Sequence, residues 1–124
     1  MIKIEVDESY AFDYLSILHL KYDLDKTNAL KESNYLRCLN FIKKQFSDDL
    51  FQSIINSVEY KDCYNANFQT YEAVDLAKTN LVAASYVDKC NYKRHVAKQK
   101  LQKKFFNSNL TEIKIGYEQY SKEK

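Results

Sequence analysis

The residues of this 124-residue chain with the clearest potential for chemistry form a basic segment in its C-terminal third. Between Asp88 and Glu112 the chain has no acidic residue. Lys89, Lys93 and Lys100 share the spacing of one helix face with Lys104, which offers a surface to the phosphates of a nucleic acid or to another anion. The candidate anion-binding residues are Lys89, Lys93, Arg94, Lys98, Lys100 and Lys104.

The same segment has two alternative interpretations. Cys90, Ala97, Leu101 and Phe105 form an apolar stripe on another face, which is typical of a basic amphipathic helix whose lysines are merely solvated. Charge is also unevenly distributed, because residues 1–75 have a net charge of −5 and residues 76–124 have one of +7. The basic helix is therefore also suited to an acidic protein surface, either on the chain's own first half or on a second subunit.

Four carboxylates form a second candidate site. Glu59 and Asp62 are three residues apart, and so are Glu72 and Asp75. If the chain reverses between the two pairs, all four would face one another, and such hard oxygen ligands suit magnesium. The alternative is that the acids are solvated at two helix ends.

The two acidic pairs resemble the paired ExxE and ExxD motifs of the all-α nucleotide pyrophosphohydrolases. In that family such carboxylates hold magnesium over a nucleoside triphosphate, so the resemblance implies a magnesium-dependent pyrophosphohydrolase-like enzyme. Asp62 stands where the family has its second Glu, and the gap between the pairs is shorter than in the family. Both departures weaken this implication.

Ser16, His19 and Asp23 are the residue types of a hydrolytic triad, at i, i+3 and i+7 along one helix face. Side chains on one helix point outward roughly in parallel, and no neighbouring segment supplies oxyanion donors or a strained nucleophile turn. We therefore expect a hydrogen-bonded or solvated histidine and assign no catalytic residue.

The composition excludes several cofactor sites. Gly116 is the only glycine, so neither a P-loop nor a Rossmann turn is present. Neither histidine follows a glutamate by three residues, which excludes the di-iron pattern of helical bundles. The three cysteines lack the short CxxC spacing of zinc and redox sites and are expected to be free thiols. No cofactor is expected.

Three helices are predicted ahead of the basic segment, over residues 8–22, 27–46 and 48–60. Their apolar residues recur every three or four positions, and Ser47 followed by two aspartates is a typical N-cap. The turn-forming residues of 61–67 place the next connection there.

Residues 68–106 contain no Gly or Pro and are predicted to form one long helix. It would measure about 60 Å, whereas a compact chain of this length has a radius of gyration of about 14 Å. The helix must therefore bend, near Thr79 and Asn80 or near Cys90 and Asn91, or be supported by a second subunit. We favour the second subunit and predict a homodimer.

Short alternating segments at both ends predict strands over 2–6 and 111–116 that pair with each other, followed by a polar tail over 117–124. The expected fold is mainly α, or α+β by strict count: one domain, 1–124, built as a four-helix bundle with two short terminal strands. An all-α bundle is the alternative.

No segment approaches the run of about eighteen apolar residues that a membrane span needs, and the N-terminal residues lack the features of a secretory leader. We therefore expect a cytoplasmic protein that does not bind membranes.

Two segments, MIKIEVDESYAFDYLSIL and VDKCNYKRHVAKQKLQKKFF, resemble small uncharacterised proteins of T4-like marine phages. That resemblance implies the cytoplasm of an infected host and brings no assigned activity. Abundant tyrosine, an amphipathic basic helix and the lack of a coherent set of reacting groups together favour a non-enzymatic binding or regulatory protein. Its partner would be an unidentified protein, and nucleic-acid binding through residues 89–104 is the main alternative.

Overall fold

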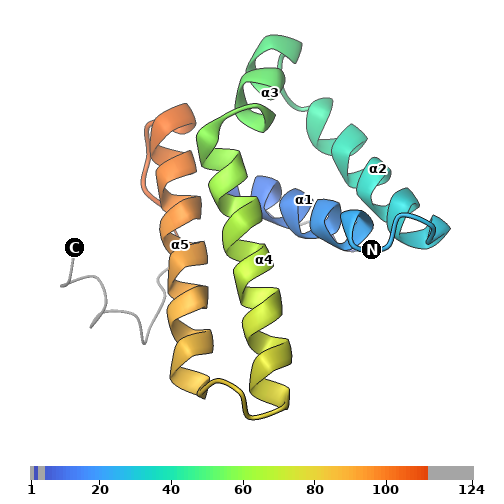
Figure 1. The fold of residues 1–124 in the computed structure, drawn as a ribbon. Coiled ribbons are helices and arrows are strands. Elements are labelled where there is room, and N and C mark those ends of the chain that lie inside the picture. Colours follow the sequence, from blue (N-terminus) through green and yellow to red (C-terminus); the bar gives the residue numbers. More distant parts are fainter. Residues whose placement is uncertain (1, 3–4, 112–124) are drawn as a thin grey trace.

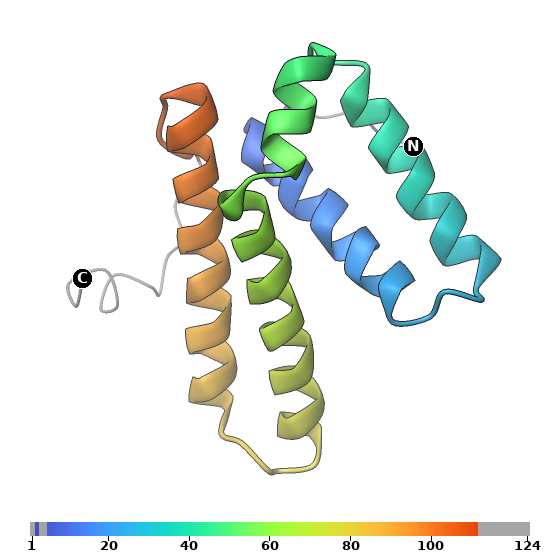
Figure 2. The ribbon, with the colours of Figure 1, turned by 45° about the horizontal axis from the view of Figure 1, so that its top comes forward.

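Five helices form two antiparallel hairpins joined by a short helix (Figures 1 and 2). The structure is a computed structural model and describes residue 2 and residues 5–111. The elements are α1 (Glu8–Asp23), α2 (Ala29–Lys43), α3 (Asp48–Ile55), α4 (Val58–Lys78) and α5 (Ala84–Phe106). The predicted mainly helical fold class is confirmed, and the described residues support its all-α form.

Local side chains start three of the helices. Asn28, Ser47 and Ser57 each accept hydrogen bonds from backbone amides in the first turns of α2, α3 and α4. Such N-caps satisfy amides that have no partner within the helix. The cap predicted at Ser47 is confirmed. Ser57 caps a helix that the sequence had not placed there.

One apolar core receives side chains from all five helices. Phe12 of α1 is fully buried and packs on Phe46 and Phe51 with ring centroids 5.6 and 6.2 Å apart. The buried cluster consists of Phe12, Leu15, Ile42, Phe51, Ile54, Tyr60, Cys63, Ala97 and Leu101. Because these residues come from every helix, the two hairpins and α3 are held together by a common core.

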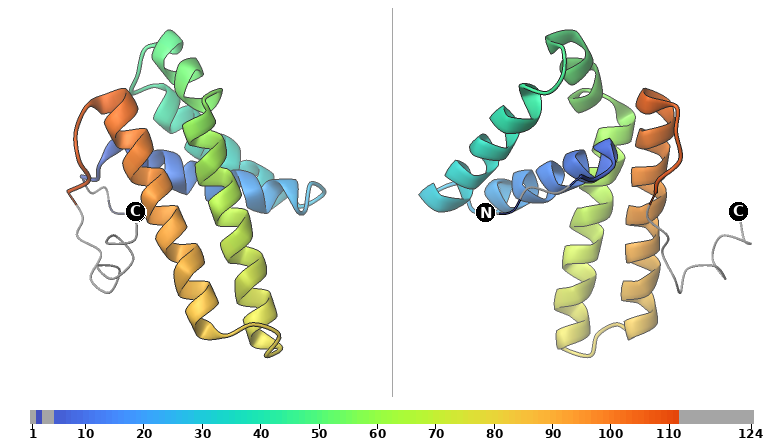
Figure 3. Two further views of the ribbon diagram at one scale, coloured as in Figure 1. Left: turned by 60° about the vertical axis from the view of Figure 1, so that its left-hand side comes forward. Right: turned by 180° about the vertical axis from the view of Figure 1, so that it is seen from behind.

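The α4–α5 hairpin is the longest feature of the molecule, and α1 crosses one of its two broad faces (Figure 3, right). The half of the hairpin nearest its turn extends past α1 (Figures 1 and 3). On the opposite broad face, none of the other described helices lies over the hairpin (Figure 1).

The prediction of one helix over 68–106 is wrong, because a turn at residues 79–83 divides it into the end of α4 and all of α5. Asn80 has a φ of 59°, and the Leu81 amide donates to the Leu76 carbonyl oxygen at 2.9 Å. This is the Schellman pattern, in which a left-handed residue closes a helix C-terminus. The break near Thr79 and Asn80, considered as an alternative, is the correct one. With the chain folded back on itself, helix length no longer argues for a second subunit.

Other boundaries also differ from the predictions. The first helix agrees within one residue, the second is shorter than 27–46, and the third ends at Ile55 instead of residue 60. Residues 61–67, predicted as a connection, belong to α4. The basic helix α5 ends at Asn107, a left-handed residue with a φ of 49°.

The predicted strands find no support among the described residues. Ile2, Glu5 and Val6 have no regular secondary structure, and neither has Thr111. The remaining residues of the predicted strands 2–6 and 111–116, and the whole tail 117–124, lie outside the described residues.

Replacing Asn80 tests the turn. Asn80→Ala should lower the free energy of unfolding by about 1 kcal/mol, because a residue with a Cβ and no local hydrogen bond is unfavourable in the left-handed region. Denaturant unfolding followed by circular dichroism measures the change. The control is Asn65→Ala, at an exposed position inside α4, where alanine should leave stability unchanged or slightly raised. A stability gain at both positions would indicate a continuous helix instead.

Candidate interaction surface

The four carboxylates predicted as a magnesium site are not brought together. Glu59, Asp62, Glu72 and Asp75 all lie on α4, and the chain does not reverse between the two pairs. The ten residues from Asp62 to Glu72 span about 15 Å along the helix axis. In the part of the chain that the structure describes, no group of three or more His, Cys, Asp or Glu residues is arranged to hold a metal ion.

Ser16, His19 and Asp23 do not act as a unit either. The buried Ser16 hydroxyl donates to the Asp13 backbone carbonyl oxygen at 2.7 Å and accepts from Asn67. His19 Nε2 lies 3.3 Å from Asp23 Oδ2. The Tyr64 hydroxyl donates to the same Asp23 oxygen at 2.7 Å. The serine thus belongs to one hydrogen-bonded group and the histidine to another.

The three cysteines are free, as predicted. Cys63 and Cys90 are buried, and desolvation raises the pKa of the Cys63 thiol to about 12. Desolvation also raises the pKa of Cys38. At neutral pH the Cys38 and Cys63 thiols therefore stay protonated, which makes them poor nucleophiles and poor metal ligands.

The predicted anion-binding residues divide into two groups on different sides of α5. Arg94 and Lys98 point toward α1, where both have partners. Lys104 pairs with Glu59 of α4 at 3.1 Å. Lys89, Lys93 and Lys100 are exposed as well, but none of them forms an ion pair with a described residue. The basic segment is therefore partly structural and partly open to a ligand.

A buried polar network joins α1 to both helices of the hairpin. Arg94 Nη2 donates to Asp13 Oδ2 at 3.2 Å, and Arg94 Nε donates to the Asn67 side-chain oxygen. Asn67 Nδ2 donates to Asp13 Oδ1 at 3.0 Å and to Ser16 Oγ at 2.7 Å. Asp13, Ser16 and Asn67 are buried, and 25% of the Arg94 side chain is exposed. Each charged group thus has its partner inside the fold.

A second set of polar contacts lies further along the same side of α5. The buried Lys98 ammonium sits 4.3 Å from the centroid of the Tyr10 ring. Gln102 accepts from the Ser9 amide and donates to Glu8 and to Ser108, each at 2.9 Å. Gln102, Asp13 and Asn67 were not predicted from the sequence as functional residues. Each is a polar residue at a helical position that faces the core, and this was the sequence signal that could have identified them.

The uncovered broad face of the hairpin, opposite α1, is here called the outer face. On α5, Lys89 and Lys93 are nine and five residues before Lys98, so at about 100° per residue they lie on the side away from α1. On α4, Glu72 and Leu76 are five and nine residues after Asn67 and are likewise turned away.

Charge on the outer face is arranged in two stripes. It includes Asp62, Glu72 and Leu76 of α4 with Tyr86, Lys89, Lys93 and Lys100 of α5. The pKa of Tyr86 is raised, first by the Cys90 thiol and, after desolvation, also by the Glu72 carboxylate. An acidic stripe on α4 therefore lies beside a basic stripe on α5, with Leu76 and Tyr86 between the charges and the hairpin turn.

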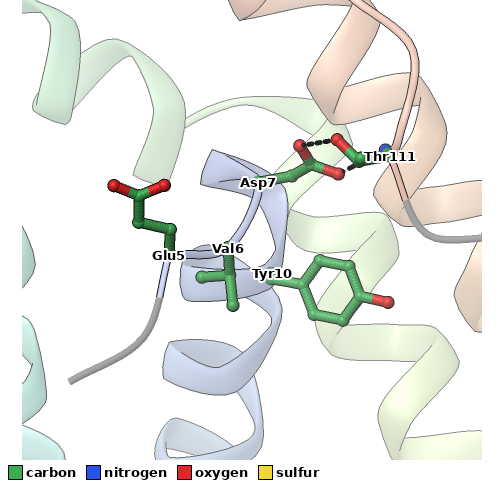
Figure 4. Close-up of a pocket in the computed structure, with 5 residues that line it drawn as sticks. All are labelled: Glu5, Val6, Asp7, Tyr10 and Thr111. Atoms are coloured by element: carbon green, nitrogen blue, oxygen red, sulfur yellow. Dashed lines mark hydrogen bonds between the residues drawn. The ribbon is translucent and has the colours of Figure 1, made fainter.

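A hollow lined by acidic side chains lies at the start of α1, away from this face. It has a volume of about 530 Å³ and is lined by Glu5, Val6, Asp7, Tyr10 and Thr111. The Asp7 carboxylate accepts from the Thr111 amide and hydroxyl at 2.6 and 2.7 Å, and Glu5 points away from this pair (Figure 4). Because Asp7 is engaged with Thr111, the hollow offers a ligand little besides Glu5 and the Tyr10 ring.

Comparison of the chain with models of known protein families, with curated proteins and with solved structures gives no match. The resemblance to phage proteins stays a prediction. Over the residues that the structure describes, no helix is both long and apolar enough to cross a membrane.

The ionic contact between α1 and α5 can be tested by truncation. Asp13→Ala should reduce the free energy of unfolding by roughly 2 to 3 kcal/mol, because it leaves the largely buried Arg94 guanidinium without its counter-charge. The control is Asp25→Ala, which removes the exposed pair with Lys31 and should cost less than about 1 kcal/mol. Urea unfolding of both variants measures the difference. Equal losses would contradict the role given to Asp13.

Proposed function

We propose that this protein is a small, non-enzymatic binding or regulatory protein of the cytoplasm that contacts a protein partner through the outer face of its α4–α5 hairpin. The observation behind this proposal is that the outer face has exposed apolar side chains next to exposed charged ones, while α1 covers the other face. Leu76 and Tyr86 are 39% and 46% exposed. Exposed aromatic and apolar side chains beside charged ones are a usual feature of protein–protein contacts.

The proposal also accounts for the charges of the hairpin. Lys89, Lys93 and Lys100 form no ion pair within the described part of the chain, and the same is true of Asp62 and Glu72. A partner with both acidic and basic groups can pair with both stripes at once. Such a partner is more readily a protein than a polyanion, because Asp62 and Glu72 would repel phosphates.

Site-specific cross-linking tests the proposed surface. A photoreactive phenylalanine analogue at Tyr86 should give a cross-linked protein in the cells that produce this chain, because the outer face is occupied there. The same analogue at Leu30, an exposed residue of α2, is the control and should give none. The Tyr86 product should disappear in the Lys89→Glu/Lys93→Glu variant. No product at Tyr86, or the same products from both positions, would overturn the proposal.

Nucleic-acid binding is a second candidate, favoured by the three exposed lysines. Lys89, Lys93 and Lys100 lie on one side of α5 and have no acidic partner among the described residues. A nucleic acid bound there would be held mainly through its phosphates, with Tyr86 available to stack on a base.

Salt dependence separates this candidate from a protein partner. Binding to a labelled single strand or duplex should fall steeply between about 50 and 200 mM salt, since each phosphate contact releases a counterion. Lys93→Glu/Lys100→Glu should abolish retention. Lys26→Glu, at an exposed position between α1 and α2, should weaken it only slightly. If no oligonucleotide is retained at the lowest salt, the candidate is excluded.

A further inference from the structure

We propose that the partner at the outer face is a second copy of this chain, packed so that α4 of each copy lies on α5 of the other. The inference rests on the proposed function, because it names the partner of the same surface. Helix length, from which a homodimer was predicted, no longer supports one in the folded structure. The pattern of side chains on the outer face supports a dimer for a different reason.

Two contacts within the hairpin show which residues of α4 and α5 are level with each other. Glu59 pairs with Lys104 near the open end, and Asn67 pairs with Arg94 further toward the turn. Because the two helices are antiparallel and rise equally per residue, these contacts fix the other level pairs. The pairs on the outer face are Asp62 with Lys100, Leu76 with Tyr86, and Glu72 with Lys89, with Lys93 about one helical turn further along.

Two identical hairpins can pack face to face about a two-fold axis in two simple ways. If the axis is perpendicular to the helices, α4 lies on α4, which brings the acidic stripes together and the basic stripes together. If the axis is parallel to the helices, α4 lies on α5 of the second copy. Like charges facing each other across an interface cost several kcal/mol, so the charge pattern selects the parallel axis.

A parallel axis leaves each residue at its own level along the hairpin. Glu72 of one copy therefore meets Lys89 of the other, with Lys93 about one helical turn away, and Asp62 meets Lys100. At the next level toward the turn, Leu76 meets Tyr86, which buries an apolar pair on each side of the axis.

The arrangement has no steric obstacle among the described helices. In each copy α1 lies on the far side of the hairpin (Figure 3, right). The four helices of two hairpins then form a bundle with an isologous interface, in which one surface serves both copies. The outer face is thus complementary to itself in both charge and apolar character.

Charge reversal with mixing tests this interface by sedimentation equilibrium over a range of protein concentrations. Glu72→Lys alone and Lys89→Glu/Lys93→Glu alone should each raise the dimer dissociation constant at least tenfold, since about 1.4 kcal/mol of repulsion suffices for that change. An equimolar mixture of the two variants should dimerise at least as tightly as the unmodified chain, because every stripe again faces its opposite. A mere loss of folding could not produce that recovery.

The control is Glu32→Lys on α2, an exposed acid away from the outer face, which should leave the dissociation constant unchanged. Dimers that persist in both single-sided variants would place the contact elsewhere and overturn the inference. An unmodified chain that stays monomeric would also overturn it. In that case a Tyr86 cross-link to a different protein would preserve the proposed function, whereas no cross-link at all would remove both.

Discussion

The ion pair between Arg94 and Asp13 is the contact on which the arrangement of the two hairpins depends. A guanidinium taken largely out of water requires a compensating charge and hydrogen-bond acceptors. Asp13 supplies the charge from α1, and Asn67 of α4 links the two groups. The network forms with α1 on one broad face of the hairpin, where it joins all three helices. The opposite face is consequently left for other contacts.

The position of α1 divides the basic helix into two functional sides. Toward α1, Arg94 and Lys98 are engaged with Asp13 and with the Tyr10 ring. The charge imbalance between the two halves of the chain is thus partly neutralised inside the fold. On the other side, Lys89 and Lys93 keep their charge exposed beside the acids of α4. Among the described residues of α5, the exposed lysines without an ion pair lie on this second side, which is why both candidate functions use the same face.

Local sequence signals located some helix ends and missed others, including the turn that decides the topology. The caps at Ser47 and Asn107 are short-range effects, so a single sequence shows them. Asn80 ends α4 in the same left-handed conformation as Asn107, but good helix-forming residues flank it and no glycine marks the turn. The sequence therefore indicated a turn at Asn80 less strongly than it indicated one continuous helix over residues 68–106.

Because α4 continues through residues 61–67, both acidic pairs share one helix, and the predicted metal site is not formed.

The sequence by itself determined the helical class, several capping residues, the free thiols, the lack of a glycine-rich phosphate loop and the uneven charge. These properties depend on composition or on neighbours within one or two helical turns. Only the tertiary structure decided which cations are buried, which carboxylates are close together and which face of the hairpin is uncovered. Arg94 and Asp13 are 81 residues apart in the chain. Helical periodicity shows that a face is apolar or charged, but the identity of the helix that covers it depends on such long-range contacts.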